Sequence, residues 1–259
     1  MPELPDLQVF ARNLNKELHG KQVKRVHVEN KRKLKVNEKV LRNRLEKQEL
    51  TKVYREGKEL YFAFGNGAVL AMHLMLHGKL YLYEGKHSQK YPIIDLQFAD
   101  DTGLVLTDYQ GAATPTLDPE EKTAPDALAK EAGLKYLKER LAATRAAVKN
   151  VLLDQKVLRG IGNAYADEIL WEAGISPFSA SNKIPADKVK ALAKAIPKVL
   201  KQAEQHIRKT HPDLIAGEVR DFLTIHNAKK THSPTGGAIL HKVVNSRKTY
   251  YTEEQELYE

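Results

Sequence analysis

Cysteine is absent from the 259-residue chain. Disulfides, thiolate nucleophiles and zinc or iron–sulfur sites ligated by cysteine are therefore excluded. Long apolar runs are absent too: nothing approaches the ~18 consecutive apolar residues of a membrane-spanning helix, and the first residues lack the segments of a signal peptide. The sequence therefore predicts a soluble protein of the cytoplasm with no membrane partner.

Acidic residues are too few to balance the basic ones: 42 Lys and Arg face 33 Asp and Glu, which gives a formal net charge of +9. An excess of this sign favours a polyanionic partner through electrostatic steering and counterion release. Nucleic acid is the leading candidate, and a basic surface that only aids solubility is the alternative. Hydrophobic residues make up 42% of the chain, enough for two ordinary domains or one large one.

Two hydrophobic patterns divide the chain. From about Val23 to Thr107, alternating stretches broken by turn residues predict antiparallel β structure, in a sandwich or barrel. From about Ala127 to Leu223, Ala, Leu, Lys and Glu recur at helical spacing and predict consecutive helices. A further helix is predicted near the start, with one apolar face formed by Leu7, Phe10, Ala11, Leu14 and Leu18.

The ends of these regions are marked by changes in composition. Prolines and acids gather at 114–128, which is typical of a linker, and alternation returns at 239–244 and 249–252, which predicts a β-hairpin. We therefore predict an N-terminal domain (1–117), a linker (118–127), a helical domain (128–223) and a hairpin finger (224–259).

Glycines interrupt the helical pattern within DQKVLRGIGNAYADEILWEAGISP. A helix is expected to end at Gly160, a turn with Gly162 follows, and Asn163 is placed to cap a new helix that buries Tyr165, Ile169 and Leu170. A glycine turn that leads into a helix exposes backbone N–H groups and a positive dipole end, which together bind phosphate. The alternative is an ordinary pair of helix caps.

The chain start, MPELPD, carries a second possible chemistry. Removal of Met1 would give Pro2 a secondary amine, and an α-amino group has a pKa near ~8, well below that of lysine. Such an amine can attack an aldehyde-like carbon and form an iminium, while Glu3 moves protons at the same carbon. The alternative is that these residues only introduce a helix.

Several short motifs, in order along nearly the whole chain, resemble the formamidopyrimidine-DNA glycosylase and endonuclease VIII family. MPELPDLQVF resembles the family's MPELPE start, and DQKVLRGIGNAYADEILWEAGISP is similar to its helix-two-turn-helix motif. REGKEL around Lys58 is similar to its β-hairpin lysine, HLMLHG at His73 to its H-L-G-M-S-G, and SRKTYY at Arg247 to its finger arginine.

The resemblance implies an α+β fold: an N-terminal β-sandwich with flanking helices, then a helical domain with the helix-two-turn-helix motif and a β-hairpin finger. It implies a bifunctional DNA glycosylase and abasic-site lyase of base excision repair, which excises oxidised bases through a Schiff base at its N-terminal proline and then cuts the strand by β,δ-elimination. No cofactor is implied. The implied partner is double-stranded DNA with oxidised bases or abasic sites, bound by a monomer in the cytoplasm, or at the nucleoid of a bacterium.

The resemblance also implies roles for single residues. Pro2 is the nucleophile at C1′ of the damaged nucleotide, Glu3 transfers protons, and Lys58 and Asp6 complete the catalytic set. Backbone contacts around an everted base are expected from His73, Asn163 and Arg247, with Gly160 and Gly162 in the phosphate-binding turn. The alternative roles are purely structural: Lys58 would be a solvated turn lysine, His73 a packed strand histidine and Arg247 a surface arginine.

Departures from the family bear mainly on the substrate. The zinc-binding cysteines are missing, and His226, His232 and His241 match no closed zinc site, so a zincless finger is predicted. DYQGAA (108–113) stands where D-x-R-R-F-G is common, and Leu76 replaces a usual methionine, which leaves Leu76 or Tyr109 as the wedge that fills the gap in the duplex.

Two further departures lie at the ends of the chain. The segment after AGEVRDFL reaches the finger quickly, without the longer loop that closes over 8-oxoguanine in some family members, which favours oxidised pyrimidines or ring-opened purines as substrates. At the other end, Asp6 replaces the glutamate of the family's start motif. Two other functions stay open. One is a damaged-DNA-binding protein of the same fold that has lost catalysis, with Met1 retained, and the other is an RNA-binding role that leaves Pro2, Glu3 and Lys58 unexplained.

Overall fold

The computed structural model describes the backbone of residues 1–259 and every side chain except that of Lys33. The chain forms two compact units, each described by itself. Unit 1 comprises Met1–Glu121 and His206–Glu218, and unit 2 comprises Lys122–Gln205 and Val219–Glu259. The first change of unit falls inside the predicted linker. The return of 206–218 to unit 1 has no counterpart in the predicted boundaries.

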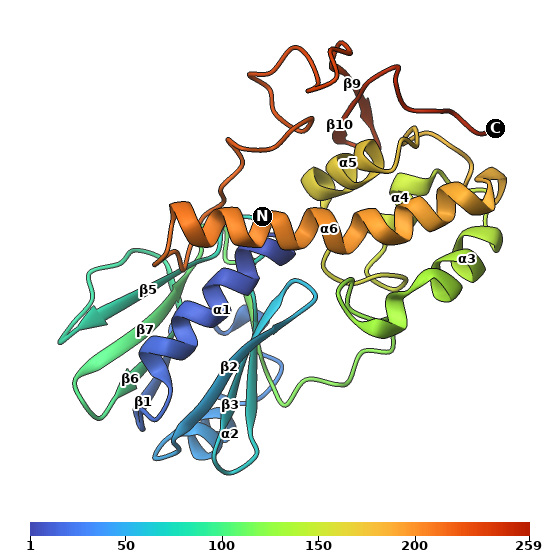
Figure 1. Ribbon diagram of the computed structural model, residues 1–259. Helices are drawn as coiled ribbons and strands as arrows, with labels where there is room; N and C mark the ends of the chain where they lie inside the picture. The colour runs from blue at the N-terminus through green and yellow to red at the C-terminus, as the bar shows by residue number, and fades with distance from the viewer. The chain divides into compact units, whose positions relative to one another are not determined.

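Unit 1 is the predicted β-sandwich, built from two four-stranded antiparallel sheets with the orders β1-β6-β7-β5 and β2-β3-β4-β8 (Figure 1). Their inward side chains form one apolar core, as the period-two alternation predicts. The strands are β1 Val23–Val28, β2 Leu50–Glu56, β3 Glu59–Phe64, β4 Val69–His73, β5 Lys79–Glu84, β6 Pro92–Phe98, β7 Thr102–Thr107 and β8 Thr114–Leu117.

Two helices and a short 3₁₀ turn complete the first part of unit 1. Helix α1 (Leu4–Leu18) packs along β2, and its predicted apolar face is confirmed because the five residues of that face are at most 2% exposed. Full burial of a large apolar side chain contributes roughly 1.5–3 kcal/mol, so this face anchors the start of the chain. Helix α2 (Glu38–Leu45) is capped by Asn37 and follows a 3₁₀ turn, η1 (Lys31–Lys33).

The segment that returns to unit 1 begins in the last residues of helix α6 (Ala186–Thr210) and continues beyond it. Leu214 and Ile215 pack against the core of the sandwich. The Asn13 side-chain amide on α1 donates to the Leu214 carbonyl at 2.9 Å. This part of the chain is therefore held beside α1 by both apolar and polar contacts.

Unit 2 contains the predicted helices and the predicted hairpin. Its short helices are α3 (Leu134–Ala142), α4 (Val148–Leu153) and α5 (Asn163–Glu172), with 3₁₀ turns η2 (Lys130–Ala132) and η3 (Ser181–Lys183). Strands β9 (Leu240–Val244) and β10 (Arg247–Tyr251) pair through a tight turn at Asn245 and Ser246, whose φ angles are 50° and 60°. Positive φ at both positions matches the twist of a two-residue hairpin. None of the described helices is both long enough and apolar enough to cross a membrane.

The glycine turn differs from the prediction at both ends. Helix α4 ends at Leu153 rather than near Gly160, and the N-cap of α5 is Gly162 rather than Asn163. Asn163 is instead the first helical residue, because its side-chain amide donates to the Lys248 carbonyl at 2.9 Å and so points away from the backbone N–H groups that a cap would bind. The predicted burial of Tyr165, Ile169 and Leu170 is confirmed.

Candidate active site and nucleic-acid interface

The first turn of α1 is closed by two acids. The Asp6 carboxylate accepts the Glu3 backbone N–H at 2.9 Å, and the Glu3 side chain accepts the Asp6 backbone N–H in return. This reciprocal capping box satisfies N–H groups that a helix start otherwise leaves unpaired. Pro2, Glu3 and Asp6 are all buried, so the start of the chain has a defined conformation. Aspartate at position 6 is long enough to close the box.

A carboxylate from the far end of unit 1 meets the chain start. The Met1 α-amine forms an ion pair with the Glu218 side chain, and both groups are 35% exposed. Glu218 follows Gly217, whose φ of 89° lies in the left-handed region that glycine favours. Glu218 was not among the predicted site residues.

The sheet β2-β3-β4-β8 brings Lys58 and His73 to one end of the sandwich. Lys58 lies in the tight turn between β2 and β3, and Glu59, the next residue, pairs with His73 at the end of β4. The β2 side chain Arg55 donates to Gln8 of α1 at 2.9 Å. This contact ties the Lys58 hairpin to the part of α1 that directly follows the chain start.

One hydrogen bond assigns the tautomer of the His73 ring. The Met75 backbone N–H donates to His73 Nδ1 at 3.0 Å. Because a backbone amide can only donate, Nδ1 carries no hydrogen, and the ring hydrogen of the neutral imidazole lies on Nε2. His73 is half-buried, and a ring N–H is a donor of the kind that contacts phosphate oxygens.

The predicted wedge residues lie on neighbouring loops. Leu76 and Tyr109 are 58% and 59% exposed, and the His77 and Tyr109 rings lie 4.6 Å apart. The Tyr109 loop is held from inside by Asp108, which is 3% exposed and accepts three backbone N–H groups, those of Gln110, Ala112 and Ala113. Exposed apolar side chains on a braced loop suit insertion between bases.

In unit 2 the glycine turn and the finger meet through Asn163. Gly160 has a φ of 108°, and its N–H donates to the Gln155 side chain at 2.9 Å, which fixes the turn before α5. The hydrogen bond from Asn163 to the Lys248 carbonyl links the start of α5 to β10, next to the exposed Arg247. The predicted DNA-binding residues of this unit therefore lie close together.

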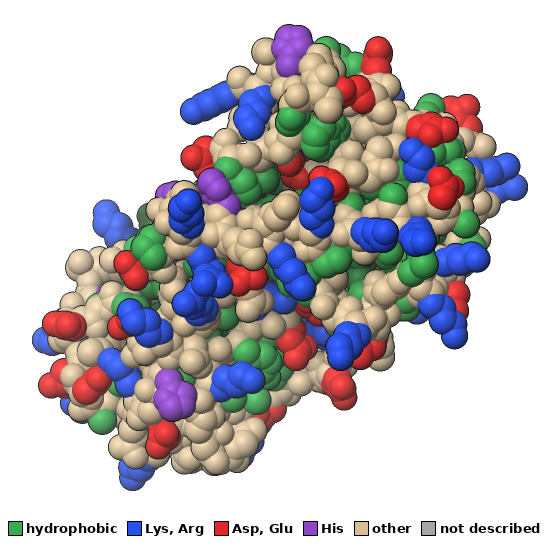
Figure 2. All heavy atoms as spheres, in the orientation of Figure 1, with side chains coloured by type: hydrophobic (Ala, Val, Ile, Leu, Met, Phe, Trp, Pro, Cys, Tyr) green, Lys and Arg blue, Asp and Glu red, His purple; other side chains and the backbone are tan. Residues whose placement is uncertain are grey.

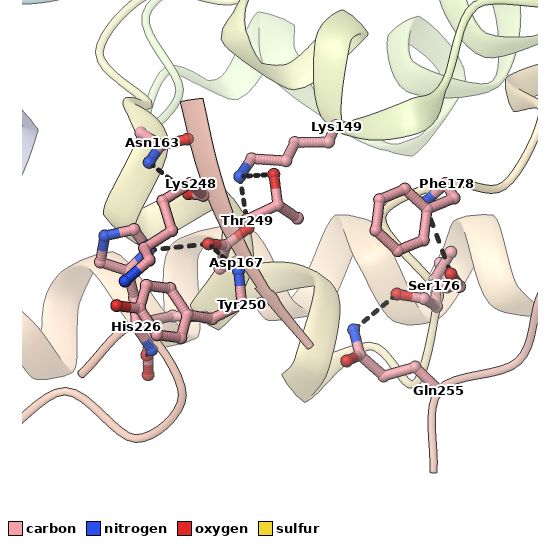
Figure 3. A network of polar contacts seen from close by, with 12 residues as sticks. Lys149, Asn163, Asp167, Ser176, Phe178, His226, Lys248, Thr249, Tyr250 and Gln255 are labelled. Atoms are coloured by element: carbon pink, nitrogen blue, oxygen red, sulfur yellow. Dashed lines mark hydrogen bonds and ion pairs between the residues drawn. The ribbon is translucent and has the colours of Figure 1, made fainter. Parts of the chain in front are cut away.

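A buried ionic network holds the hairpin against α5 (Figure 3). Lys149 Nζ lies 2.7 Å from Asp167 Oδ1 and donates to the Thr249 hydroxyl at 2.8 Å. The second oxygen of Asp167 accepts the Tyr250 backbone N–H at 2.9 Å and lies 2.7 Å from His226 Nδ1. The Asp167 side chain is 0% exposed, so its charge depends on these partners.

Two more carboxylates organise the finger loops. Glu168 accepts the backbone N–H groups of Thr224, Ile225 and His226 at 2.7–2.9 Å. Glu254 accepts the hydroxyls of Thr235 and Ser233 at 2.6 and 2.7 Å, and these hydrogen bonds lower the pKa of Glu254. Among the described side chains, no group of three or more His, Asp or Glu is arranged to hold a metal ion.

Basic side chains dominate part of the surface. Figure 2 shows Lys and Arg side chains gathered along α6, with fewer acids between them. The sequence of this helix, ADKVKALAKAIPKVLKQAEQHIRKT, explains the pattern, because its apolar residues recur at helical spacing and its lysines fill the other face. A row of cations on a helix suits a polyanionic partner.

The residues missed by sequence reasoning are acids and their partners. Glu218, Asp167 and Glu168 each bind groups on distant segments, and no local motif marks them. Asp108 binds backbone groups of its own loop. The only signal for Asp108 was its place at the start of DYQGAA.

Together, the β-sandwich that begins at a buried Pro-Glu pair, the glycine turn before α5 and the hairpin finger define a DNA glycosylase fold of the helix-two-turn-helix class. Two family models match: the formamidopyrimidine-DNA glycosylase N-terminal domain over residues 1–114 and the formamidopyrimidine-DNA glycosylase H2TH domain over residues 123–211. The chain belongs to the formamidopyrimidine-DNA glycosylase family.

Curated relatives are similar over their full length. A formamidopyrimidine-DNA glycosylase of Lactobacillus gasseri is 30% identical over 97% of each chain, and one of Ureaplasma parvum is 32% identical over 97% of this chain and 98% of the relative. Among solved structures, Lactococcus lactis formamidopyrimidine-DNA glycosylase bound to DNA with an abasic site shares the fold with a TM-score of 0.87, at 24% identity and over 98% of this chain and 100% of that chain.

Proposed function

We propose that this protein is a bifunctional DNA glycosylase and abasic-site lyase that acts on oxidised bases in double-stranded DNA. The proposal rests on the buried Pro-Glu start of α1 in a chain of the formamidopyrimidine-DNA glycosylase family. The buried capping box supports it, because a nucleophile at a chain terminus needs a fixed position to react.

The reaction begins at Pro2 once Met1 is removed. The unprotonated amine attacks C1′ of the damaged nucleotide, the bond from C1′ to the base breaks, and the electron pair leaves with the base, which takes up a proton. Glu3 is the proton-transfer residue, with Asp6 and Lys58 in support. The C1′–O4′ bond then breaks, O4′ takes up a proton, and the opened sugar is left as an iminium between C1′ and the Pro2 nitrogen. The iminium makes the hydrogens at C2′ acidic, and successive β- and δ-elimination expel the phosphates on either side of the sugar.

In this proposal, contacts to the DNA backbone hold the everted nucleotide. His73 acts in unit 1, and Asn163, Arg247 and the turn of Gly160 and Gly162 act in unit 2. The row of cations on α6 and the net charge of +9 support DNA as the partner. The exposed Leu76 and Tyr109 fill the space that the everted base leaves.

Borohydride trapping tests the proposal. Protein whose N-terminus is shown by mass spectrometry to be Pro2 is incubated with abasic-site or thymine-glycol DNA and borohydride, and the cross-linked peptide is sequenced. We expect a covalent complex through residue 2 that Pro2→Gly strongly reduces. Absence of a complex, or a complex that Pro2→Gly leaves undiminished, would refute the proposal.

A lesion panel tests the substrate class. The short segment before the finger and the missing D-x-R-R-F-G loop lead us to propose stronger cleavage of an oxidised pyrimidine or a ring-opened purine than of 8-oxoguanine opposite cytosine. Preference for 8-oxoguanine would contradict this.

One observation favours a second function. The ion pair between the Met1 amine and Glu218 gives a retained methionine a defined place, which suits a protein that binds damaged DNA without catalysis. Mass spectrometry of the protein from its own cells separates the two: an intact Met1 supports the binding protein, and a free Pro2 supports the enzyme.

A further inference from the structure

The N-terminal amine pairs with a carboxylate outside the predicted catalytic set. Glu218 and Met1 lie at opposite ends of the part of the chain that forms unit 1, and their side chains are only about one-third exposed. Two acids at the start of α1, the cap residue Glu3 and the helical Asp6, lie nearer in sequence, but their carboxylates already accept each other's backbone N–H groups. The ion pair of the amine is made with Glu218.

The position of Glu218 is built into unit 1. Asn13 of α1 holds the Leu214 carbonyl, and Leu214 and Ile215 pack against the sandwich core, so the segment before Glu218 is fixed to the same helix that begins at the chain start. Gly217 then turns the chain through the left-handed region, and a Cβ on it would meet nothing within 4 Å. The local space allows small movements of this turn.

A carboxylate in a protein that binds DNA carries an electrostatic cost, because it repels phosphates. The presence of Glu218 is better explained by a cation that its carboxylate binds. Removal of Met1 moves the amine by one residue, ~3.8 Å along the chain, to Pro2. A glutamate side chain on a glycine turn can follow a shift of that size.

We propose that Glu218 is a positioning residue for the reactive amine: its carboxylate binds the amine of the first residue and holds it in one orientation for the covalent step. The inference rests on the proposed function for its consequence in catalysis. Its first part, a charge contact with the amine, holds for either form of the terminus.

Two substitutions separate charge from position. Glu218→Gln keeps an oxygen that accepts from the amine but removes the charge that attracts its ammonium form, so the N-terminus should react faster with an amine reagent. Glu218→Ala removes both. Glu17→Gln is the matched control, because Glu17 is an exposed acid at the other end of α1, paired with Lys16.

Chemical labelling tests the contact without DNA. Each protein is treated with limiting acetic anhydride across a pH series, and acetylation of the N-terminal peptide is compared with that of lysine peptides by mass spectrometry. Between pH 6 and 7.5 we expect the N-terminus of Glu218→Gln to react about threefold faster than wild type, because the carboxylate no longer favours the unreactive ammonium form. A labelling curve that superimposes on those of wild type and Glu17→Gln would overturn the proposal.

Single-turnover trapping at saturating abasic-site DNA tests the positioning. We expect Glu218→Gln to stay within about twofold of the wild-type plateau and Glu218→Ala to fall about tenfold, since a misdirected nucleophile loses rate without losing substrate. A Glu218→Ala plateau equal to wild type would overturn the positioning role. Failure of the proposed function looks different, because wild-type protein that begins at Pro2 would then form no trapped complex, while the difference in labelling rate between Glu218→Gln and wild type would remain.

Discussion

The buried pair of Lys149 and Asp167 gives a direct test of how the finger hairpin is held. Their side chains are 6% and 0% exposed and 2.7 Å apart. Lys149→Met keeps most of the aliphatic chain but removes the cation. Loss of one partner from a buried pair costs ~3–5 kcal/mol. Because His226 and the Tyr250 backbone N–H still contact the other Asp167 oxygen, we expect the lower end, about 3 kcal/mol.

Urea unfolding followed by tryptophan fluorescence measures this loss, since Trp171 is the one tryptophan of the chain and lies on α5. Lys198→Met is the matched control. Lys198 of α6 is 51% exposed and pairs with Glu172 of α5, so loss of its charge should cost less than ~1 kcal/mol. Adding Asp167→Asn to Lys149→Met removes the stranded charge and should recover at least ~1 kcal/mol. Equal losses for Lys149→Met and Lys198→Met would refute the assignment of the network as the main support of the hairpin.

Three further predictions concern single side chains of known environment. Asp108→Ala deletes the acceptor of three backbone N–H groups and should destabilise unit 1 by about 2–3 kcal/mol, seen as a lower thermal midpoint; an unchanged midpoint would contradict the bracing role. The pKa of Asp100 is lowered to about 2, first by the hydrogen bond from Lys21 and then by that from Thr102, so this carboxylate stabilises the fold above pH 3.8 and the benefit disappears as the pH falls towards 2. The stability difference between wild type and Lys21→Met should therefore shrink across that window, and a constant difference would count against the pair. Ser246→Gly relieves a φ of 60° in the hairpin turn and should raise the urea midpoint, by a stabilisation of ~0.5–1 kcal/mol, and a lowered midpoint would show that the turn is not strained.

Elements defined by neighbouring residues can be predicted from this sequence. The face of α1 and the alternation of the sandwich strands each follow one period over several residues, and burial enforces that period. The β9–β10 hairpin is predictable for the same reason. The cap of α5 is not: Gly162 and Asn163 are both acceptable N-cap residues, and the choice depends on the Lys248 carbonyl, which is distant in sequence.

The residues of the candidate site also differ in whether neighbouring residues or distant ones define them. Pro2, Glu3 and the glycine turn are recognisable because short motifs carry them. Glu218 and Asp167 are single acids in ordinary surroundings, and their partners lie far away along the chain. Their roles depend on which segments the fold brings together, and a charge that pairs over such a separation leaves no periodic signal.

Helix α5 combines two tasks that are usually considered separately. Asn163 and Asp167 are four residues apart, so their side chains share one face of the helix, and both bind β10: one through the Lys248 carbonyl, the other through the Tyr250 N–H. Glu168, the next residue, binds the segment that leads into the finger. The helix whose first turn follows the glycines of the proposed phosphate-binding turn is therefore also the base of the finger. A displacement of β10 from α5 would move Arg247 relative to that turn, so in the proposed DNA-binding role the acids of α5 would set the spacing between these two contacts.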